Sequence, residues 1–237
     1  MAWANVAANN VHLYGETTGT TIVLAYATNL TAGSLLVCAV TFADAGGTIT
    51  ATCADSKSQT WVNAVGPTRN ASLGGVGFTQ YLFYFENTGS GADTVTVTFS
   101  ATVEFRRLNL HEYTGIATSG AFDQSSGAIG NSAAPNSGSQ TTTADNELIY
   151  GAAITDSSDV VAGSGFTDRG QADTADRTED KNGTPPGSFS AAFTCTSSQW
   201  IAQMATFKEP SGAAPDTVSF RGSFPPAKRT TWPSLTY

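Results

Sequence analysis

The stretch DTVTVTF, residues 93–99, alternates polar and apolar side chains from Thr94 to Phe99. Val95, Val97 and Phe99 fall on one face of an extended chain, and the threonines between them fall on the other. This alternation predicts a β-strand that buries one face and presents the other to solvent.

The same reasoning predicts nine further strands and no helix, each strand bounded by clusters of Gly, Asn, Asp or Ser. They span residues 20–26, 34–42, 47–52, 59–65, 78–86, 105–113, 147–154, 188–194 and 199–207. Residues 34–42 and 78–85 are apolar on both faces, which is typical of central strands covered on both sides. We therefore predict an all-β fold, an antiparallel two-sheet β-sandwich of jelly-roll or Greek-key type with an extended C-terminal arm.

Composition narrows the classes of function. Only 13% of the residues are charged, the formal net charge is −8 and the isoelectric point is about 4.5. This acidity opposes binding of the body to nucleic acid or to an anionic membrane, so we predict neither as a partner. The first residues show no secretory leader, and the longest apolar run nearby, residues 35–40, is too short to span a bilayer.

The last 28 residues, 210–237, differ from the rest of the chain. They hold five of the nine prolines, and from Thr217 onward they contain three basic residues and no acidic one. Residues 1–216 keep the other 8 of the 11 basic residues and all 19 acidic ones. We predict a β-sandwich domain at 1–209 and an extended arm at 210–237.

The arm combines aromatic anchors with positive charge, which favours docking on an acidic, grooved protein surface, such as that of a neighbouring copy. The predicted partner-binding residues are Phe220, Arg221, Phe224, Lys228, Arg229, Trp232 and Tyr237. Two alternatives stay open, a disordered appendage and an additional strand formed by residues 218–220 on the arm's own domain.

One predicted strand carries polar and aromatic side chains on a single face. These are Phe105, Arg107, Asn109, His111 and Tyr113, while Leu108 and Leu110 point to the core. An exposed row of this kind suits a glycan, because rings stack on sugars and Arg or Asn bonds to hydroxyls. The alternative is an ordinary polar sheet face or one covered by a loop.

The chain contains no recognisable catalytic or metal-binding motif. His12 and His111 are the only histidines and have no Cys or carboxylate at ligand spacing, and the chain has no nucleophile elbow, P-loop or dinucleotide fingerprint. We therefore predict no enzyme, no cofactor and no metal site.

Two further features leave their interpretation open. The acidic segment 168–181 is predicted to be a solvated, internally paired loop, with a calcium loop and an acceptor for a neighbour's arm as alternatives. Cys38 is expected to be a buried free thiol, and a disulfide between Cys53 and Cys195 is an alternative to two further free thiols.

Several segments together resemble a known module. They are TCADSKSQTW, YLFYFENTGSGADTVTVTFS, RRLNLHEYTGI, DNELIYGAAI, GSGFTDR and SSQWIAQMATFK. In strand-and-turn texture, over about residues 20–208, they resemble a β-sandwich module found in bacteriophage virion proteins and in large surface or secreted proteins of environmental bacteria. The resemblance implies a binding or structural role and brings no catalytic residues with it.

The single module, the arm and the lack of a leader favour the phage context, in which a protein is made in the host cytoplasm and placed on the virion surface. A bacterial cell-surface or extracellular location is the alternative. The sequence thus predicts a non-enzymatic virion structural protein, a capsid decoration, cement or tail- and fibre-associated subunit. Its partners would be other virion proteins or copies of itself. The alternative function is a carbohydrate-binding or adhesion module for host surface glycans.

Overall fold

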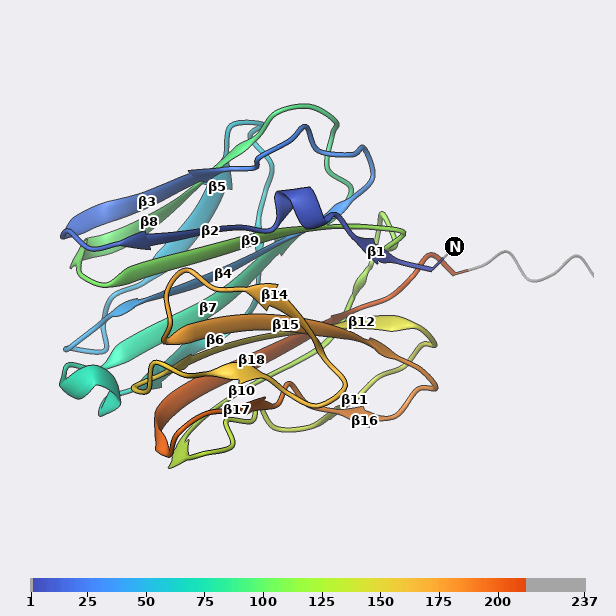
Figure 1. Cartoon of the computed structure of the whole chain (residues 1–237). Helices are drawn as coiled ribbons and strands as arrows, with labels where there is room; N and C mark the ends of the chain where they lie inside the picture. The colour runs from blue at the N-terminus through green and yellow to red at the C-terminus, as the bar shows by residue number, and fades with distance from the viewer. Residues whose placement is uncertain (1, 212–237) are drawn as a thin grey trace, which may run out of the picture.

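The computed structural model describes residues 2–211, which form antiparallel β-sheets packed against one another (Figure 1). Within this part of the chain the only helical turns are η1 (Ala7–Asn9) and η2 (Leu73–Gly75), and neither approaches the length or hydropathy needed to cross a membrane. The predicted all-β fold of packed antiparallel sheets is confirmed.

Three principal sheets and two short ones make up the fold. The first sheet has the order β1 (Ala4–Asn5), β9 (Arg106–Thr114), β4 (Leu35–Ala43), β7 (Phe78–Phe85) and β6 (Val62–Asn70), and β2 (Val11–Gly15) also pairs with β9. The second has the order β10 (Phe122–Ser132), β18 (Ser198–Phe207), β12 (Glu147–Thr155), β15 (Asp176–Gly183) and β14 (Thr167–Gly170). The third has the order β3 (Gly19–Ala25), β8 (Thr94–Val103) and β5 (Ala51–Asp55). The short sheets pair β11 (Gln140–Thr141) with β16 (Ser188–Phe189) and β13 (Val161–Ala162) with β17 (Phe193–Thr194).

Residues 11–114 form a jelly roll. The chain passes back and forth between the order β2-β9-β4-β7 in the first sheet and β3-β8-β5 in the third, as it does in the two sheets of a jelly roll. One strand departs from that pattern, because β6 extends the first sheet beside β7 instead of joining β5.

Residues 122–207 repeat this topology. The order β10-β18-β12-β15-β14 matches β2-β9-β4-β7-β6 strand for strand. The short sheets β11-β16 and β13-β17 occupy the place that β3-β8-β5 takes in the first half. The body therefore consists of two jelly-roll halves with the same strand order.

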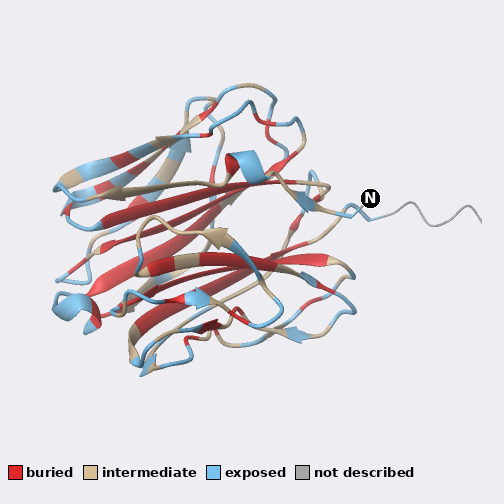
Figure 2. Cartoon of the chain, in the orientation of Figure 1, coloured by how far each residue is buried: buried red, intermediate tan, exposed pale blue. Residues whose placement is uncertain are grey.

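The halves pack through their large sheets, so both large sheets are covered on both faces (Figure 2). The third sheet covers the first through Leu36, Val40, Leu110 and Val97. The opposite face of the first sheet meets the second sheet through Leu35, Val37, Leu148 and Phe207, all at most 1% exposed. The sequence predicted two packed sheets, and the structure adds a further layer on each side.

Two long strands of the second sheet, β10 and β15, lie outside the ten predicted strands. β10 falls in the Ser- and Gly-rich stretch around residues 125–140, and β15 falls in the charged stretch 168–181. Both are strands because of their neighbours: β10 pairs with β18 over most of its length, and β15 pairs with β12 and β14. The prediction that residues 168–181 form a loop is wrong for β15.

All three cysteines are free thiols, and Cys38 is fully buried as predicted. Cys53 lies on β5 in the first half, whereas Cys195 follows β17 in the second half. The alternative of a disulfide between these two residues is therefore wrong for this fold.

Candidate functional site

The predicted glycan row lies between the two halves. Arg107, Asn109, His111 and Tyr113 project from β9 toward the second sheet and are at most 7% exposed. The prediction that this row is exposed is wrong for these four side chains, because the second jelly roll covers them. Of the row, only Phe105 remains at the surface, with 38% of its area exposed.

The four buried side chains meet the acidic strand β15 and the turn before it. Arg107 Nη2 lies 2.5 Å from Asp173 Oδ2, and Asn109 Nδ2 donates to Asp176 Oδ2 at 2.7 Å. At the other end of the row, Tyr113 donates its hydroxyl to Asp180 Oδ2 at 2.8 Å. We call this set of β9 side chains and their partners Asp173, Asp176, Thr178 and Asp180 the polar seam.

Two ion pairs lie within the acidic segment 168–181 itself. Arg169 Nε contacts Asp180 Oδ2 at 2.6 Å, and Arg177 Nη1 contacts Asp168 Oδ2 at 2.9 Å. The internal pairing predicted for this segment is thus confirmed. The alternative in which the segment receives a neighbour's arm has no support, because Asp173, Asp176 and Asp180 already bind groups of their own chain.

His111 lies in the middle of the seam and is fully buried. Its Nδ1 is 3.0 Å from the Tyr150 hydroxyl and its Nε2 is 3.2 Å from Thr178 Oγ1. Burial holds the pKa of His111 well below its usual value of 6.5, and the neighbouring His12 acts in the same direction. The imidazole is therefore neutral, as a buried group without a counter-charge must be.

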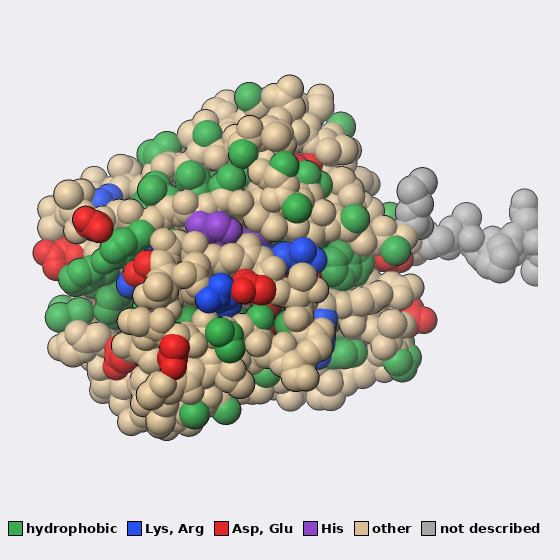
Figure 3. Space-filling model, viewed as in Figure 1, with side chains coloured by type: hydrophobic (Ala, Val, Ile, Leu, Met, Phe, Trp, Pro, Cys, Tyr) green, Lys and Arg blue, Asp and Glu red, His purple; other side chains and the backbone are tan. Residues whose placement is uncertain are grey.

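The two histidines approach each other although they are 99 positions apart in the chain, with ring centroids 5.5 Å apart. His12 Nδ1 is 2.7 Å from Asn109 Oδ1, and the pKa of His12 is also lowered, chiefly by burial. Histidine atoms are visible on the boundary between the halves in Figure 3. His12 is partly exposed, whereas His111 is fully buried.

Burial raises the pKa of Asp176 to about 6, against hydrogen bonds from the Asp173 and Ala172 amides and from Asn109 that favour the charged form. A reaction at the seam would need substrate to reach His111 or Asp176, and both are at most 2% exposed. The seam therefore acts in this conformation as a polar contact between the halves.

Among residues 2–211 no cluster of three or more His, Cys, Asp or Glu has metal-site geometry.

On the opposite side of the interface, the equivalent strands of the two halves pack in the same way but without charged side chains. β18 and β7 meet there, at the positions that β9 and β15 hold in the seam. Gln203 Nε2 donates to Gln80 O at 2.9 Å, and the Phe207 and Tyr84 rings are 5.2 Å apart. The halves are thus related by an approximate two-fold axis, with one contact polar and its counterpart mostly apolar.

A surface hollow of about 250 Å³ opens at one end of the seam, between the two halves. Hydrophobic atoms gather on this edge of the molecule, where η2 lies in Figure 1 (Figure 3). We call it the aromatic hollow, lined by Tyr14, Phe78, Phe105, Arg107 and Asp156 among others. Sequence reasoning placed Phe105 and Arg107 on one row but missed Tyr14 on β2, Phe78 on β7 and Asp156 in the turn after β12.

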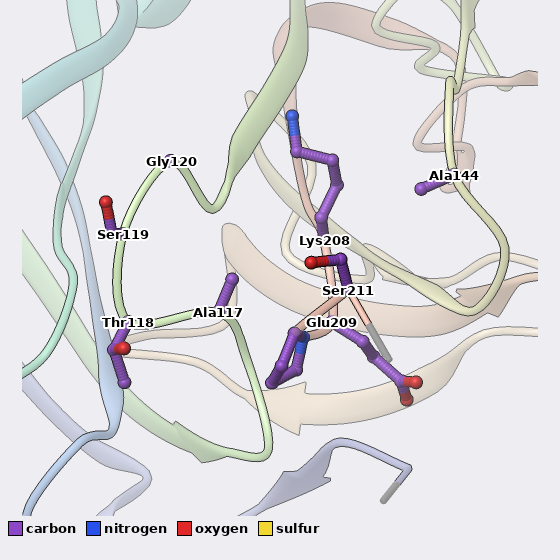
Figure 4. Close-up of a pocket in the computed structure, with 9 residues that line it drawn as sticks. Ala117, Thr118, Ser119, Gly120, Ala144, Lys208, Glu209 and Ser211 are labelled. Carbon is purple, nitrogen blue, oxygen red and sulfur yellow. The ribbon is translucent and has the colours of Figure 1, made fainter. Parts of the chain in front are cut away.

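A second hollow, of about 360 Å³, lies where the chain leaves β18 (Figure 4). The backbone of Lys208 is held on both sides, because its O accepts from Ala117 N at 2.9 Å and its N donates to Ala121 O at 2.7 Å. Glu209 Oε1 accepts from Trp3 N at 2.9 Å. In Figure 4 the side chains of Lys208 and Glu209 point in different directions. The residues that precede the arm are thus fixed to the body.

The predicted partner-binding residues of the arm lie outside the described residues. They are Phe220, Arg221, Phe224, Lys228, Arg229, Trp232 and Tyr237. Of the arm, only Pro210 and Ser211 belong to the described part of the chain, where both line the hollow beside Lys208.

Comparison with known proteins returns no relative: no family model, curated protein or solved structure matches the chain.

Proposed function

We propose that this protein is a non-enzymatic structural protein of a virion, a capsid decoration, cement or tail- and fibre-associated subunit that docks through its C-terminal arm. The observation that carries the proposal is the contrast in charge between the two parts of the chain. All 19 acidic residues lie in residues 1–216, and the segment from Thr217 to Tyr237 has only basic charges. A basic, aromatic segment on an acidic body favours attachment to an acidic surface.

The form of the body supports this assignment. Its large sheets are covered on both faces, and its buried polar groups are largely paired with one another. Hydrogen bonds at Lys208 and Glu209 hold the chain to the body directly before the arm begins. A pull on the arm would therefore be transmitted to the body at a fixed point. This arrangement suits a subunit that is tethered to a larger particle.

The partner that fits is a protein with an acidic groove, either another virion protein or a second copy of this chain. Prolines favour extended backbone, and the arm has five of them between residues 210 and 237. The aromatic residues would supply buried anchors, while Arg221, Lys228 and Arg229 would select the surface by charge.

Truncation after Glu209 tests the proposal. The described hydrogen bonds of the body end at Glu209, so we expect the shortened protein to keep its circular dichroism spectrum and thermal midpoint. We expect it to lose co-sedimentation with the particle and self-association in analytical ultracentrifugation. A matched full-length variant, R221S/K228S/R229S, should show weaker association that no longer depends on salt. Normal assembly of the truncated protein would contradict the proposal.

The glycan-binding alternative loses the face on which it was first placed, because Arg107, Asn109, His111 and Tyr113 are buried between the halves. Only the part of the row that reaches the surface at Phe105 remains available to a sugar.

A further inference from the structure

We propose that the aromatic hollow binds a neutral pyranose sugar. This binding site goes beyond the structural function proposed above and does not depend on the arm. Three aromatic rings, one carboxylate and a buried guanidinium meet in the hollow from both jelly-roll halves.

Phe105 combines an unusual backbone conformation with an exposed ring. It has a positive φ of 49°, in the left-handed region where a bulky residue is strained and glycine is the usual choice. Its side chain is also 38% exposed, so burial does not explain why a large ring stands there. A strained backbone that presents an aromatic ring to solvent is a feature of binding sites.

The neighbouring rings are fixed in place. The Arg107 guanidinium carbon lies 4.9 Å from the centre of the Tyr14 ring and 5.5 Å from that of Phe78, so the cation contacts both rings. Phe78 and Phe105 are 6.2 Å apart, tilted by 39°. Arg107 is itself held by Asp173 and donates to Phe105 O at 3.2 Å. The hollow is therefore formed before a ligand arrives, which lowers the entropic cost of binding.

The second half of the molecule supplies the hydrogen-bonding group. Asp156 is exposed at the end of β12, and its Oδ1 accepts from the amide of Gly74 in η2. Gly74 is required here, because a Cβ at this position would lie 2.6 Å from the Phe78 ring. Asp156 Oδ2 makes no hydrogen bond within residues 2–211 and can accept from a hydroxyl of a ligand.

The charges around the hollow select the class of ligand. Asp173 neutralises Arg107, so Asp156 is the exposed charge among the residues that line the hollow. A carboxylate accepts from sugar hydroxyls and repels an acidic sugar. Aromatic rings stack on the C–H face of a pyranose. A neutral hexose satisfies both requirements, and the volume of about 250 Å³ suits a short saccharide rather than a long chain.

Saturation-transfer NMR on the full-length protein tests this inference. The probes are the methyl glycosides of glucose, galactose, mannose and N-acetylglucosamine, with methyl glucuronide as the acidic comparison. We expect transfer to at least one neutral glycoside with a dissociation constant of roughly millimolar order, as for a small ligand in an open site. We expect a weaker signal with the glucuronide.

Phe105→Gly is the decisive variant, because glycine suits the positive φ and the chain should fold normally. We expect it to weaken binding about tenfold, which corresponds to the loss of one ring contact. Val23→Ser is the matched control, since Val23 is an exposed apolar residue on β3, away from the hollow, and should bind as the wild type does. Asp156→Asn should narrow the difference between neutral and acidic glycosides.

Two outcomes would overturn the inference. One is the absence of transfer with all four neutral glycosides. The other is equal binding by the wild type and by folded Phe105→Gly. Neither outcome bears on the arm, whose truncation is tested by particle association.

Discussion

At the scale of single residues, His111 has a strong effect on the pH dependence of stability. Its folded-state pKa lies well below 6.5, the value expected in the unfolded chain. Below pH 6.5 the His111 imidazole is therefore protonated in the unfolded chain and stays neutral in the folded chain until the pH reaches its lower folded-state pKa. The contribution of His111 is fully present above pH 6.5 and is lost as pH falls toward its folded pKa.

His111→Gln isolates this contribution, because Asp176 and His12 are present and titrate in both proteins. The wild type should lose stability relative to the variant between pH 7.5 and pH 5.0, by up to about 2 kcal/mol in unfolding free energy. Urea unfolding at the two pH values measures the difference in unfolding free energy. A difference that does not change with pH would mean that His111 binds a proton in the fold as readily as in the unfolded chain.

At the scale of elements, β15 explains why part of the site could not be predicted. Its sequence, DRTEDKNG, has no large apolar residue on either face, so hydrophobic periodicity gives no signal. It becomes a strand because Asp176, Thr178 and Asp180 meet the polar row of β9. A search for complementary polar rows would have detected the match.

Strands with an apolar face were predicted from the sequence with good boundaries. β4, β7, β8, β12 and β18 all coincide with predicted segments to within one residue at most ends. The row on β9 was also assigned correctly to one face. The predicted exposure of this row was wrong, because the alternation of a strand shows which side chains share a face and not what covers that face.

Asp180 and Asp168 form a matched pair for testing the polar seam. Asp180→Asn should cost about 2–3 kcal/mol, because it weakens the contacts of a buried carboxylate with Tyr113 and Arg169. Asp168 is half exposed in its pair with Arg177, so Asp168→Asn should cost less than about 1 kcal/mol. Guanidinium unfolding compares the two. Equal losses of unfolding free energy would mean that the buried contacts of Asp180 in the seam stabilise the fold no more than the exposed ion pair of Asp168 does.

At the scale of the whole molecule, the two halves share one interior. Leu35 and Val37 of the first half and Leu148, Tyr150 and Phe207 of the second belong to a single apolar cluster. Because neither half can expose this face without a large hydrophobic cost, we expect the body to unfold in one transition.

Two tryptophans can report on this cooperativity, since Trp61 lies in the core of the first half and Trp200 in that of the second. Variants that keep only one of the two as the body's fluorophore, with Trp3 and Trp232 replaced by Phe, should show coincident midpoints in urea. Midpoints separated by more than the experimental error would show that the halves unfold independently.

The repeated topology itself was not visible in the sequence. The covering sheet of the first half is one continuous three-stranded sheet, whereas that of the second half is reduced to two short pairs. The corresponding strands also differ in character, since β7 is FTQYLFYF and β15 is DRTEDKNG. Similar folds built from such different side chains leave no repeat to find.

The two contacts related by the approximate two-fold axis differ in charge, so each half can pack well only against the other half. If two copies of the first half packed together, Arg107 would be buried against β7, which has no carboxylate to pair with it. Two copies of the second half would press Asp180 against the Phe207 ring. Either arrangement buries an unpaired charge. A first half therefore pairs with a second half, whether of its own chain or of another copy, and two like halves do not associate.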